Sequence, residues 1–210
     1  MTFFHKFLIK IANFLYPSKV HGLENFNQSN VLICCNHLSM IDVVYLVKNF
    51  NKDTYFVAKK EVIENKLFGK LLSSFGGIPI DRENVDIRSL MNIIKILKSG
   101  NNLVIFPEGT RNKTGELNLL PFKGGSMVFA VKAKTPILPV IIYKKAKLFR
   151  KNHLIIGKPI LLTDFYDKTL DNDTVIKMEN LVRDKMVELQ QNLDEIVNSK
   201  KKNKKKVKNW

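Results

Sequence analysis

The sequence is poor in cysteine. Its two cysteines, Cys34 and Cys35, are neighbours in the chain, which is a poor arrangement for a single disulfide. No third cysteine is available as a partner, and no cysteine–histidine spacing matches a zinc site. The composition therefore excludes a disulfide scaffold and favours a reducing compartment.

Long hydrophobic runs are also missing. No segment approaches the roughly 18 uninterrupted apolar residues of a transmembrane helix, so we expect none. The N-terminus does not resemble a signal peptide, because Lys10 and Asn13 interrupt its apolar residues and no small-residue cleavage site follows. Together with the cysteine pattern, these features predict a cytoplasmic location.

Acidic residues are few compared with basic ones. The chain has 19 Asp and Glu against 35 Lys and Arg, which gives a formal net charge of +16. A run of lysines occupies residues 200–208, and the rest of the chain is basic as well. Such a charge favours an anionic partner: nucleic acid, an anionic membrane or a phosphorylated substrate. Charge alone does not distinguish among these three.

Short apolar runs alternate with helical patterns along the 210 residues. Strand-like runs occupy residues 31–35, 54–58, 77–80, 103–106 and 137–143, and helical periodicity occupies residues 39–49, 60–74, 85–98 and 123–131. This alternation predicts one α/β domain over residues 18–198, with a mixed, mostly parallel sheet flanked by helices. We expect its last helix at residues 173–198 and a disordered polybasic tail at residues 199–210.

The first 17 residues have a different pattern. Apolar side chains recur at helical spacing within residues 3–16, namely Phe3, Phe4, Phe7, Leu8, Ile11, Phe14 and Leu15. Lys6 and Lys10 fall on the other face, and Pro17 ends the helix. One interpretation is a helix that packs on the core of its own domain. The other is an amphipathic helix that lies in a membrane surface, which phenylalanines opposite lysines favour.

Four short motifs contain the candidate functional residues. The first is NHLSMID, residues 36–42, which follows a strand-like run. His37 is therefore expected at a strand end, where α/β folds place their sites. Asp42 could orient its imidazole as a general base. The alternative is that Ser39 and Asp42 form a capping box, which needs only the start of a helix.

The other three motifs also border strand-like runs. GGIPIDR, residues 76–82, ends in Arg82, whose planar donors suit a phosphate, and a surface ion pair is the alternative. FPEGTR, residues 106–111, has a glycine that permits a tight turn facing an anion, and Arg111 adds a second fork of donors. A plain strand-end turn is the alternative there. TPILPV, residues 135–140, indicates only a strand.

In this order and spacing, the four motifs resemble the four sequence blocks of the glycerolipid acyltransferase family, specifically its 1-acylglycerol-3-phosphate acyltransferase (lysophosphatidate acyltransferase, PlsC) branch. The similarity extends from residue 36 to 140, with compatible flanks from about residue 20 to 160. Two positions depart from the pattern: Asn112 replaces a frequent serine, and Pro79 replaces a larger apolar or aromatic residue. The departures affect the substrate assignment and leave the reaction type unchanged.

The resemblance implies acyl transfer from acyl-CoA or acyl carrier protein to the sn-2 hydroxyl of 1-acylglycerol 3-phosphate, which gives phosphatidic acid in phospholipid biosynthesis. It implies that His37 is the general base, that Asp42 orients it and that the transfer is direct. It implies no cofactor and no metal. The implied phosphate-binding residues are Arg82, Glu108, Gly109, Thr110 and Arg111. Lys123 is a further phosphate candidate, because it lies near a possible helix start. Pro139 would support the site or the acyl path.

The lysophospholipid acceptor and the product both reside in a bilayer. A helix at residues 3–16 in the interface would provide one weak anchor. The lysine tail would provide another, attracted to an anionic membrane surface by about 1 kcal/mol per lysine. We therefore expect a peripheral protein on the inner face of the cell membrane.

Three alternatives stay open. Cys35 and His37, two residues apart on a strand, could form an acyl-enzyme, although the cysteines resemble ordinary buried strand residues. Glycerol 3-phosphate, another lysophospholipid or a lyso-aminolipid could be the acceptor. The third is a basic protein that binds nucleic acid or membranes without catalysis. No recognisable nucleic-acid-binding motif supports it, and it leaves the four ordered motifs unexplained.

Overall fold

A seven-stranded sheet lies at the centre of the protein. The computed structural model describes residues 3–27, 30–50, 53–66, 68–81, 87–114, 118–123 and 125–207. The strands are β1 (Ser18–His21), β2 (Leu32–Cys35), β3 (Thr54–Lys59), β4 (Gly77–Ile80), β5 (Asn102–Ile105), β6 (Ile137–Ile142) and β7 (Asn152–Ile156). Their order is β1-β7-β6-β2-β5-β3-β4, and β6 and β7 pair antiparallel whereas the other neighbours pair parallel. The predicted α/β domain with a mixed, mostly parallel sheet is confirmed.

The five predicted strands are present, with ends that differ by at most one residue. β1 and β7 were not predicted. β1 has the sequence SKVH, which contains one strongly apolar residue and gives no alternating pattern. It forms a strand because it pairs in parallel with β7, with Val20 opposite Leu154. Tertiary pairing, which one sequence does not show, decides such a short edge strand.

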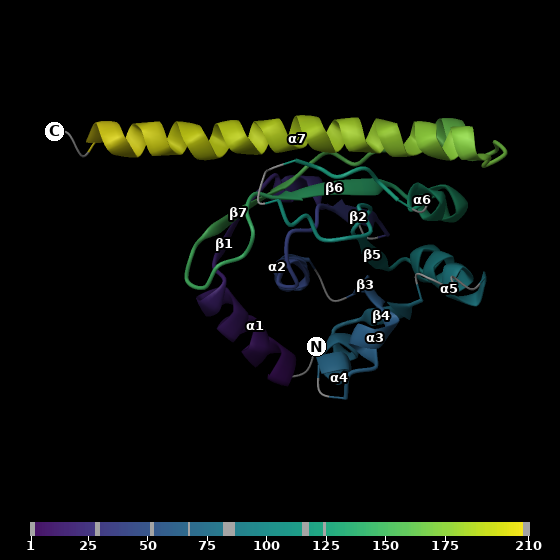
Figure 1. Ribbon diagram of the computed structural model, residues 1–210, viewed down its shortest axis with the longest axis horizontal. Helices are drawn as coiled ribbons and strands as arrows, with labels where there is room; N and C mark the ends of the chain where they lie inside the picture. Colours follow the sequence, from purple (N-terminus) through teal and green to yellow (C-terminus); the bar gives the residue numbers. More distant parts are fainter. Residues whose placement is uncertain are drawn as a thin grey trace.

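Helices cover both faces of the sheet (Figure 1). One face packs against α5 (Ile87–Lys98), α6 (Met127–Ala133) and α7 (Asn172–Val207), and the other carries α2 (Asp42–Asn49) and is bordered by α1 (Phe3–Leu15). Side chains of a strand alternate between the faces. Cys34 therefore joins the core under α7, and Cys35 joins the core under α2.

The helix expected at residues 60–74 is two helices, α3 (Lys60–Ile63) and α4 (Phe68–Ser74). The chain turns so tightly between them that a Cβ on Gly69 would lie 1.7 Å from the carbonyl oxygen of Ile63. Only glycine permits this approach. The helical periodicity of the sequence continues across the turn, so it did not reveal the break.

α7 is the longest element, and its 36 residues span about 54 Å. Its buried stripe lies on β6 and β7 and consists of Met178, Val182, Met186, Leu189, Leu193 and Val197. The helix continues to Val207, where the sequence had predicted disorder from residue 199. Lysine has a high helix propensity, and extending an existing helix needs no new nucleus, so the backbone stays helical past the domain.

α1 has no buried residue, and its outer face shows Phe3, Phe4, Phe7, Ile11 and Phe14 to solvent. Its inner face lines an apolar cavity against α2 and α4. α1 therefore has apolar residues on both its inner and its outer face. Within the described part of the chain, no helix is both long and apolar enough to cross a bilayer.

Candidate active site

His37 follows the carboxyl end of β2, between the neighbouring strands β5 and β6. Asp42 is the first residue of α2, so a short turn separates the two side chains. Within this turn, His37 Nδ1 lies 2.9 Å from Asp42 Oδ2. The structure thus brings together the two residues that the sequence paired.

The Asp42 carboxylate is fully buried and has several donors. Its Oδ2 accepts the backbone N–H groups of Leu38 (2.6 Å) and Ser39 (2.7 Å), and its Oδ1 accepts the Ser39 hydroxyl (3.0 Å). The bond to Ser39 N–H is one half of a capping box. The helix itself begins later, after Ile41, so this bond fixes the preceding turn. The capping interpretation and the catalytic one therefore share the same carboxylate.

The tautomer of His37 follows from this contact. A carboxylate oxygen can only accept, so Nδ1 donates its hydrogen to Asp42 and Nε2 keeps a free lone pair. The ring stacks on Phe106, with centroids 4.0 Å apart and planes 19° apart. The imidazole is held in one orientation and can accept a proton at Nε2.

The main chain of His37 is anchored by the FPEGTR segment. Its N–H donates to Glu108 Oε1 (2.8 Å), and its carbonyl accepts the N–H of Asn112 (2.7 Å). Glu108 Oε2 accepts the N–H of Leu120 (3.1 Å), so both carboxylate oxygens bind backbone groups. Burial raises the pKa of the Glu108 carboxyl, and the two backbone bonds offset part of this rise.

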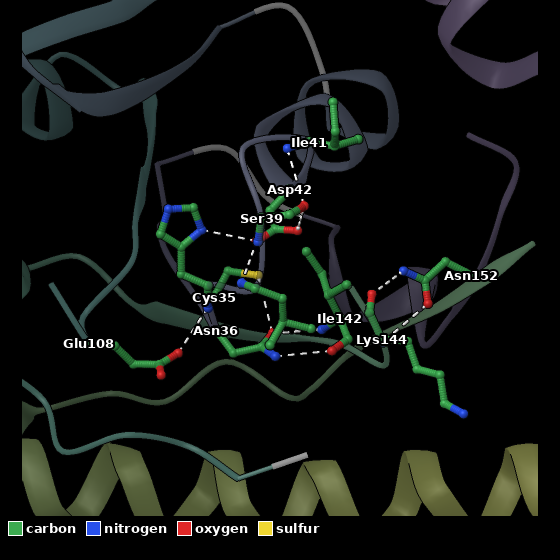
Figure 2. A network of polar contacts seen from close by, with 11 residues as sticks. Cys35, Asn36, Ser39, Ile41, Asp42, Glu108, Ile142, Lys144 and Asn152 are labelled. Atoms are coloured by element: carbon green, nitrogen blue, oxygen red, sulfur yellow. Dashed lines mark hydrogen bonds and ion pairs between the residues drawn. The ribbon is translucent and has the colours of Figure 1, made fainter. Parts of the chain in front are cut away.

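This geometry argues against direct contact between Glu108 and a phosphate. The side chain is buried, and a carboxylate offers a phosphate no hydrogen-bond donor. Glu108 is a positioning residue for His37. Asn36 is a second positioning residue, and sequence reasoning gave it no role. It exchanges hydrogen bonds with the N–H and carbonyl of Ile142 (2.7 and 3.0 Å), which ties the end of β2 to β6 (Figure 2).

His37 lines a pocket of about 230 Å³. Gly109, Thr110 and Arg111 line the same pocket, as three of the predicted phosphate-binding residues. Lys123 lies beside Gly109: its N–H donates to the carbonyl of Pro107, and its Cβ would be 3.5 Å from a Cβ on Gly109. Arg82 lies outside the described residues.

Pro139 takes a different position. It is buried in β6, and its ring faces Gly157 and α7 on the opposite face of the sheet from α2. Among the described residues that line the His37 pocket, Pro139 is not included. This placement agrees with support of the sheet beneath the site rather than with an acyl path beside His37.

A second cavity of about 260 Å³ adjoins the His37 pocket. Its lining is almost entirely apolar and comes from α1, α2 and α4. Met40, Val43, Phe56 and Leu72 line both spaces. The polar pocket at His37 therefore continues into an apolar space beneath α1, which suits a ligand with a charged head and a hydrocarbon chain.

Cys35 does not have the environment of a nucleophile. Its thiol is buried in the core under α2, where burial raises its pKa well above the ordinary value. The nearby carboxylates of Asp42 and Glu108 raise this pKa further. The thiol is therefore protonated at neutral pH and is a poor nucleophile.

A protein-family model described as Acyltransferase matches residues 17–143, which include His37, Asp42 and the FPEGTR segment. The chain belongs to this acyltransferase family. A 1-acyl-sn-glycerol-3-phosphate acyltransferase of Bacillus subtilis is 32% identical over 185 residues, covering 85% of this chain and 90% of that protein. The predicted PlsC branch of the family is confirmed.

Two further comparisons also match acyltransferases. A 1-acyl-sn-glycerol-3-phosphate acyltransferase of Cocos nucifera is 35% identical over 160 residues, and the match covers 75% of this chain and 51% of that protein. This chain thus spans about half of the coconut relative. The crystal structure of the 1-acyl-sn-glycerophosphate acyltransferase PlsC of Thermotoga maritima aligns with a TM-score of 0.62 at 27% identity, covering 88% of this chain and 80% of that one.

Proposed function

We propose that the protein transfers an acyl group from a thioester to the sn-2 hydroxyl of 1-acylglycerol 3-phosphate, which forms phosphatidic acid. The observation that carries this proposal is the His37–Asp42 pair, with its free Nε2, in one pocket with Arg111. A base and a cation in one pocket suit an acceptor that has both a hydroxyl and a phosphate. The family membership and the names of the relatives support the same reaction.

The reaction needs one base and no covalent enzyme intermediate. His37 Nε2 takes the proton of the lipid hydroxyl while the hydroxyl oxygen attacks the thioester carbonyl carbon. Asp42 stabilises the imidazolium that forms. The C–S bond then breaks, and the imidazolium returns the proton to the departing thiolate. The products are an ester and a free thiol.

The phosphate of the acceptor would bind at Gly109, Thr110 and Arg111, with Lys123 beside them. The guanidinium fork of Arg111 suits two phosphate oxygens. Arg82 is a further candidate on the basis of its motif. These cations also offset the two buried carboxylates, Asp42 and Glu108, which would otherwise repel an anionic lipid.

A hydrocarbon chain would occupy the apolar cavity beneath α1, which begins at Met40 beside the His37 pocket. The outer face of α1 would lie in the membrane surface, where exposed phenylalanines insert between lipids. The protein would then be peripheral to the inner face of the cell membrane. The C-terminal lysines would add attraction to anionic lipid.

The test is thiol release from an acyl thioester, with and without 1-acylglycerol 3-phosphate in detergent micelles. We expect release that requires the acceptor and that His37→Ala abolishes. Acyl-CoA and acyl carrier protein are compared as donors, and glycerol 3-phosphate and other lysophospholipids as acceptors. Release without any acceptor would indicate a thioesterase or an acyl-enzyme. If no combination of these donors and acceptors gives turnover, the protein would instead be a basic membrane-binding or nucleic-acid-binding protein.

A further inference from the structure

The connection between β6 and β7 has an unusual composition. The proposed acyl transfer reaction assigns no role to its residues. Residues 144–151 have the sequence KKAKLFRK, with five basic residues and no acidic one. At the tip, Leu148 exposes 52% and Phe149 64% of its surface. Two large apolar side chains are thus held in solvent between cations. We call residues 144–151 the β6–β7 hairpin.

Hydrogen bonds hold the hairpin in one shape. At its base, Asn152 Nδ2 donates to the carbonyl of Lys144 (2.6 Å), and Lys144 N–H donates to Asn152 Oδ1 (3.2 Å; Figure 2). At its tip, Arg150 N–H donates to the carbonyl of Lys147 (3.2 Å), which closes a turn over Leu148 and Phe149. The Arg150 guanidinium also binds the carbonyl of Lys145. The tip is therefore projected by a preformed loop.

Phe149 has a strained backbone. Its φ is 57°, in the left-handed region that bulky L-residues rarely adopt. Turns with a positive φ at this third position usually have glycine or asparagine there. The ring is 64% exposed, so its packing offsets only part of this strain. A strained backbone beneath a largely exposed ring points to a role beyond packing.

The hairpin tip continues the outer surface of α1. Phe149 N–H donates to the carbonyl of Leu15 (2.7 Å), and the rings of Phe14 and Phe149 meet edge to face with centroids 5.6 Å apart. Figure 1 shows the green hairpin beside the end of the purple helix α1. The exposed phenylalanines of α1 and the hairpin tip therefore form one apolar surface, with cations at its edge.

We propose that the β6–β7 hairpin is a second membrane contact, which inserts Leu148 and Phe149 into an anionic bilayer while its cations bind lipid phosphates. An apolar tip between cations matches the layered chemistry of such a surface, where acyl chains lie beneath anionic headgroups. The inference rests on the proposed function only in that the acceptor is a bilayer lipid. Contacts at α1 and at the hairpin would reinforce each other and fix the orientation of the His37 pocket.

The test uses the full chain and flotation with vesicles of phosphatidylglycerol or of phosphatidylcholine. Phe149→Asn removes the ring and places a residue that accepts a positive φ. We expect binding to phosphatidylglycerol vesicles to fall on the order of tenfold, from the lost burial of one aromatic side chain. The Tm should change little, because relief of the backbone strain offsets the loss of the edge-to-face contact with Phe14.

The matched control is Leu161→Ser. Leu161 is exposed to a similar extent, 59%, but follows Ile160, which pairs with Ile137 at the opposite end of β6. We expect this control to bind vesicles as the native chain does. Lys147→Gln should weaken binding to phosphatidylglycerol by about fivefold, the equivalent of about 1 kcal/mol per charge. Its binding to phosphatidylcholine should not change.

The proposal would be overturned if Phe149→Asn bound vesicles as the native chain does while Phe7→Ser lost vesicle binding. That result would leave α1 as the membrane contact. Equal losses in Phe149→Asn and Leu161→Ser would also overturn it, because binding would then follow general hydrophobicity. A Tm that falls while binding stays native would assign the ring to folding instead. Flotation needs no turnover, so failure of the acyl transfer reaction can be told apart from failure of this proposal.

Discussion

Replacing Glu108 by glutamine separates a positioning role from contact with substrate. The two Glu108 oxygens accept the N–H groups of His37 (2.8 Å) and Leu120 (3.1 Å). A glutamine keeps one oxygen and turns an NH₂ group toward the other backbone donor. One buried N–H thus loses its acceptor, whereas the shape and volume of the side chain are kept.

The size of the effect follows from that lost bond. Leaving a buried donor unsatisfied costs about 1–3 kcal/mol. His37 keeps its bonds to Asp42 and to the N–H of Asn112, so the displacement of its ring is small. We expect kcat to fall on the order of tenfold, because about 1.4 kcal/mol of lost positioning corresponds to a factor of ten. The KM for 1-acylglycerol 3-phosphate should change by less than about twofold.

The assay is thiol release with the acceptor varied at a saturating donor concentration. Arg111→Gln is the comparison, since a guanidinium that binds the acceptor phosphate should raise KM when removed. The reasoning would be refuted if Glu108→Gln raised KM about tenfold with kcat unchanged. Glu108 would then contact the acceptor directly, as the sequence interpretation had it.

Three further predictions address neighbouring groups. Asp42→Asn should lower kcat by on the order of 10²–10⁴, because the imidazolium loses its counter-charge, while circular dichroism stays native. Burial raises the Glu108 pKa above its ordinary 4.5, so the folded chain holds that proton to a higher pH than the unfolded chain. The free energy of unfolding of the native chain, relative to Glu108→Gln in urea titrations, should therefore fall as pH rises from about 4.5 through the raised pKa. Cys35→Ala should keep its turnover and lose about 1–2 kcal/mol of stability in the same titrations, and a loss of turnover with a native fold would restore the acyl-enzyme alternative.

Local patterns in the sequence predicted that His37 and Asp42 lie close together, whereas the roles of base and orienting carboxylate come from the family resemblance. A run of apolar residues that ends at Cys35 indicated a buried strand, and the capping-box pattern from Ser39 to Asp42 indicated a helix start. The strand end and the helix start then had to lie within one turn of each other. The 2.9 Å contact between the two side chains agrees with this reasoning.

The role of Glu108 could not be predicted in the same way. Its partners are His37, 71 residues earlier, and Leu120, 12 residues later, and both contacts are to backbone N–H groups. Backbone partners leave no signature in the side-chain sequence. The acidic residue in FPEGTR therefore looked like part of an anion-binding turn, although it faces inward.

Two buried carboxylates, Asp42 at the start of α2 and Glu108 in the segment after β5, bind the backbone of the turn after β2. The consecutive N–H groups of His37, Leu38 and Ser39 all donate to carboxylate oxygens, the first to Glu108 and the next two to Asp42. Successive N–H groups on one concave turn form an anion-binding nest. Here the protein fills that nest with its own side chains, which fixes the backbone on either side of the imidazole. Under the proposed function, the cations at Arg111 and Lys123 would serve twice, to offset these internal charges and to attract the substrate phosphate.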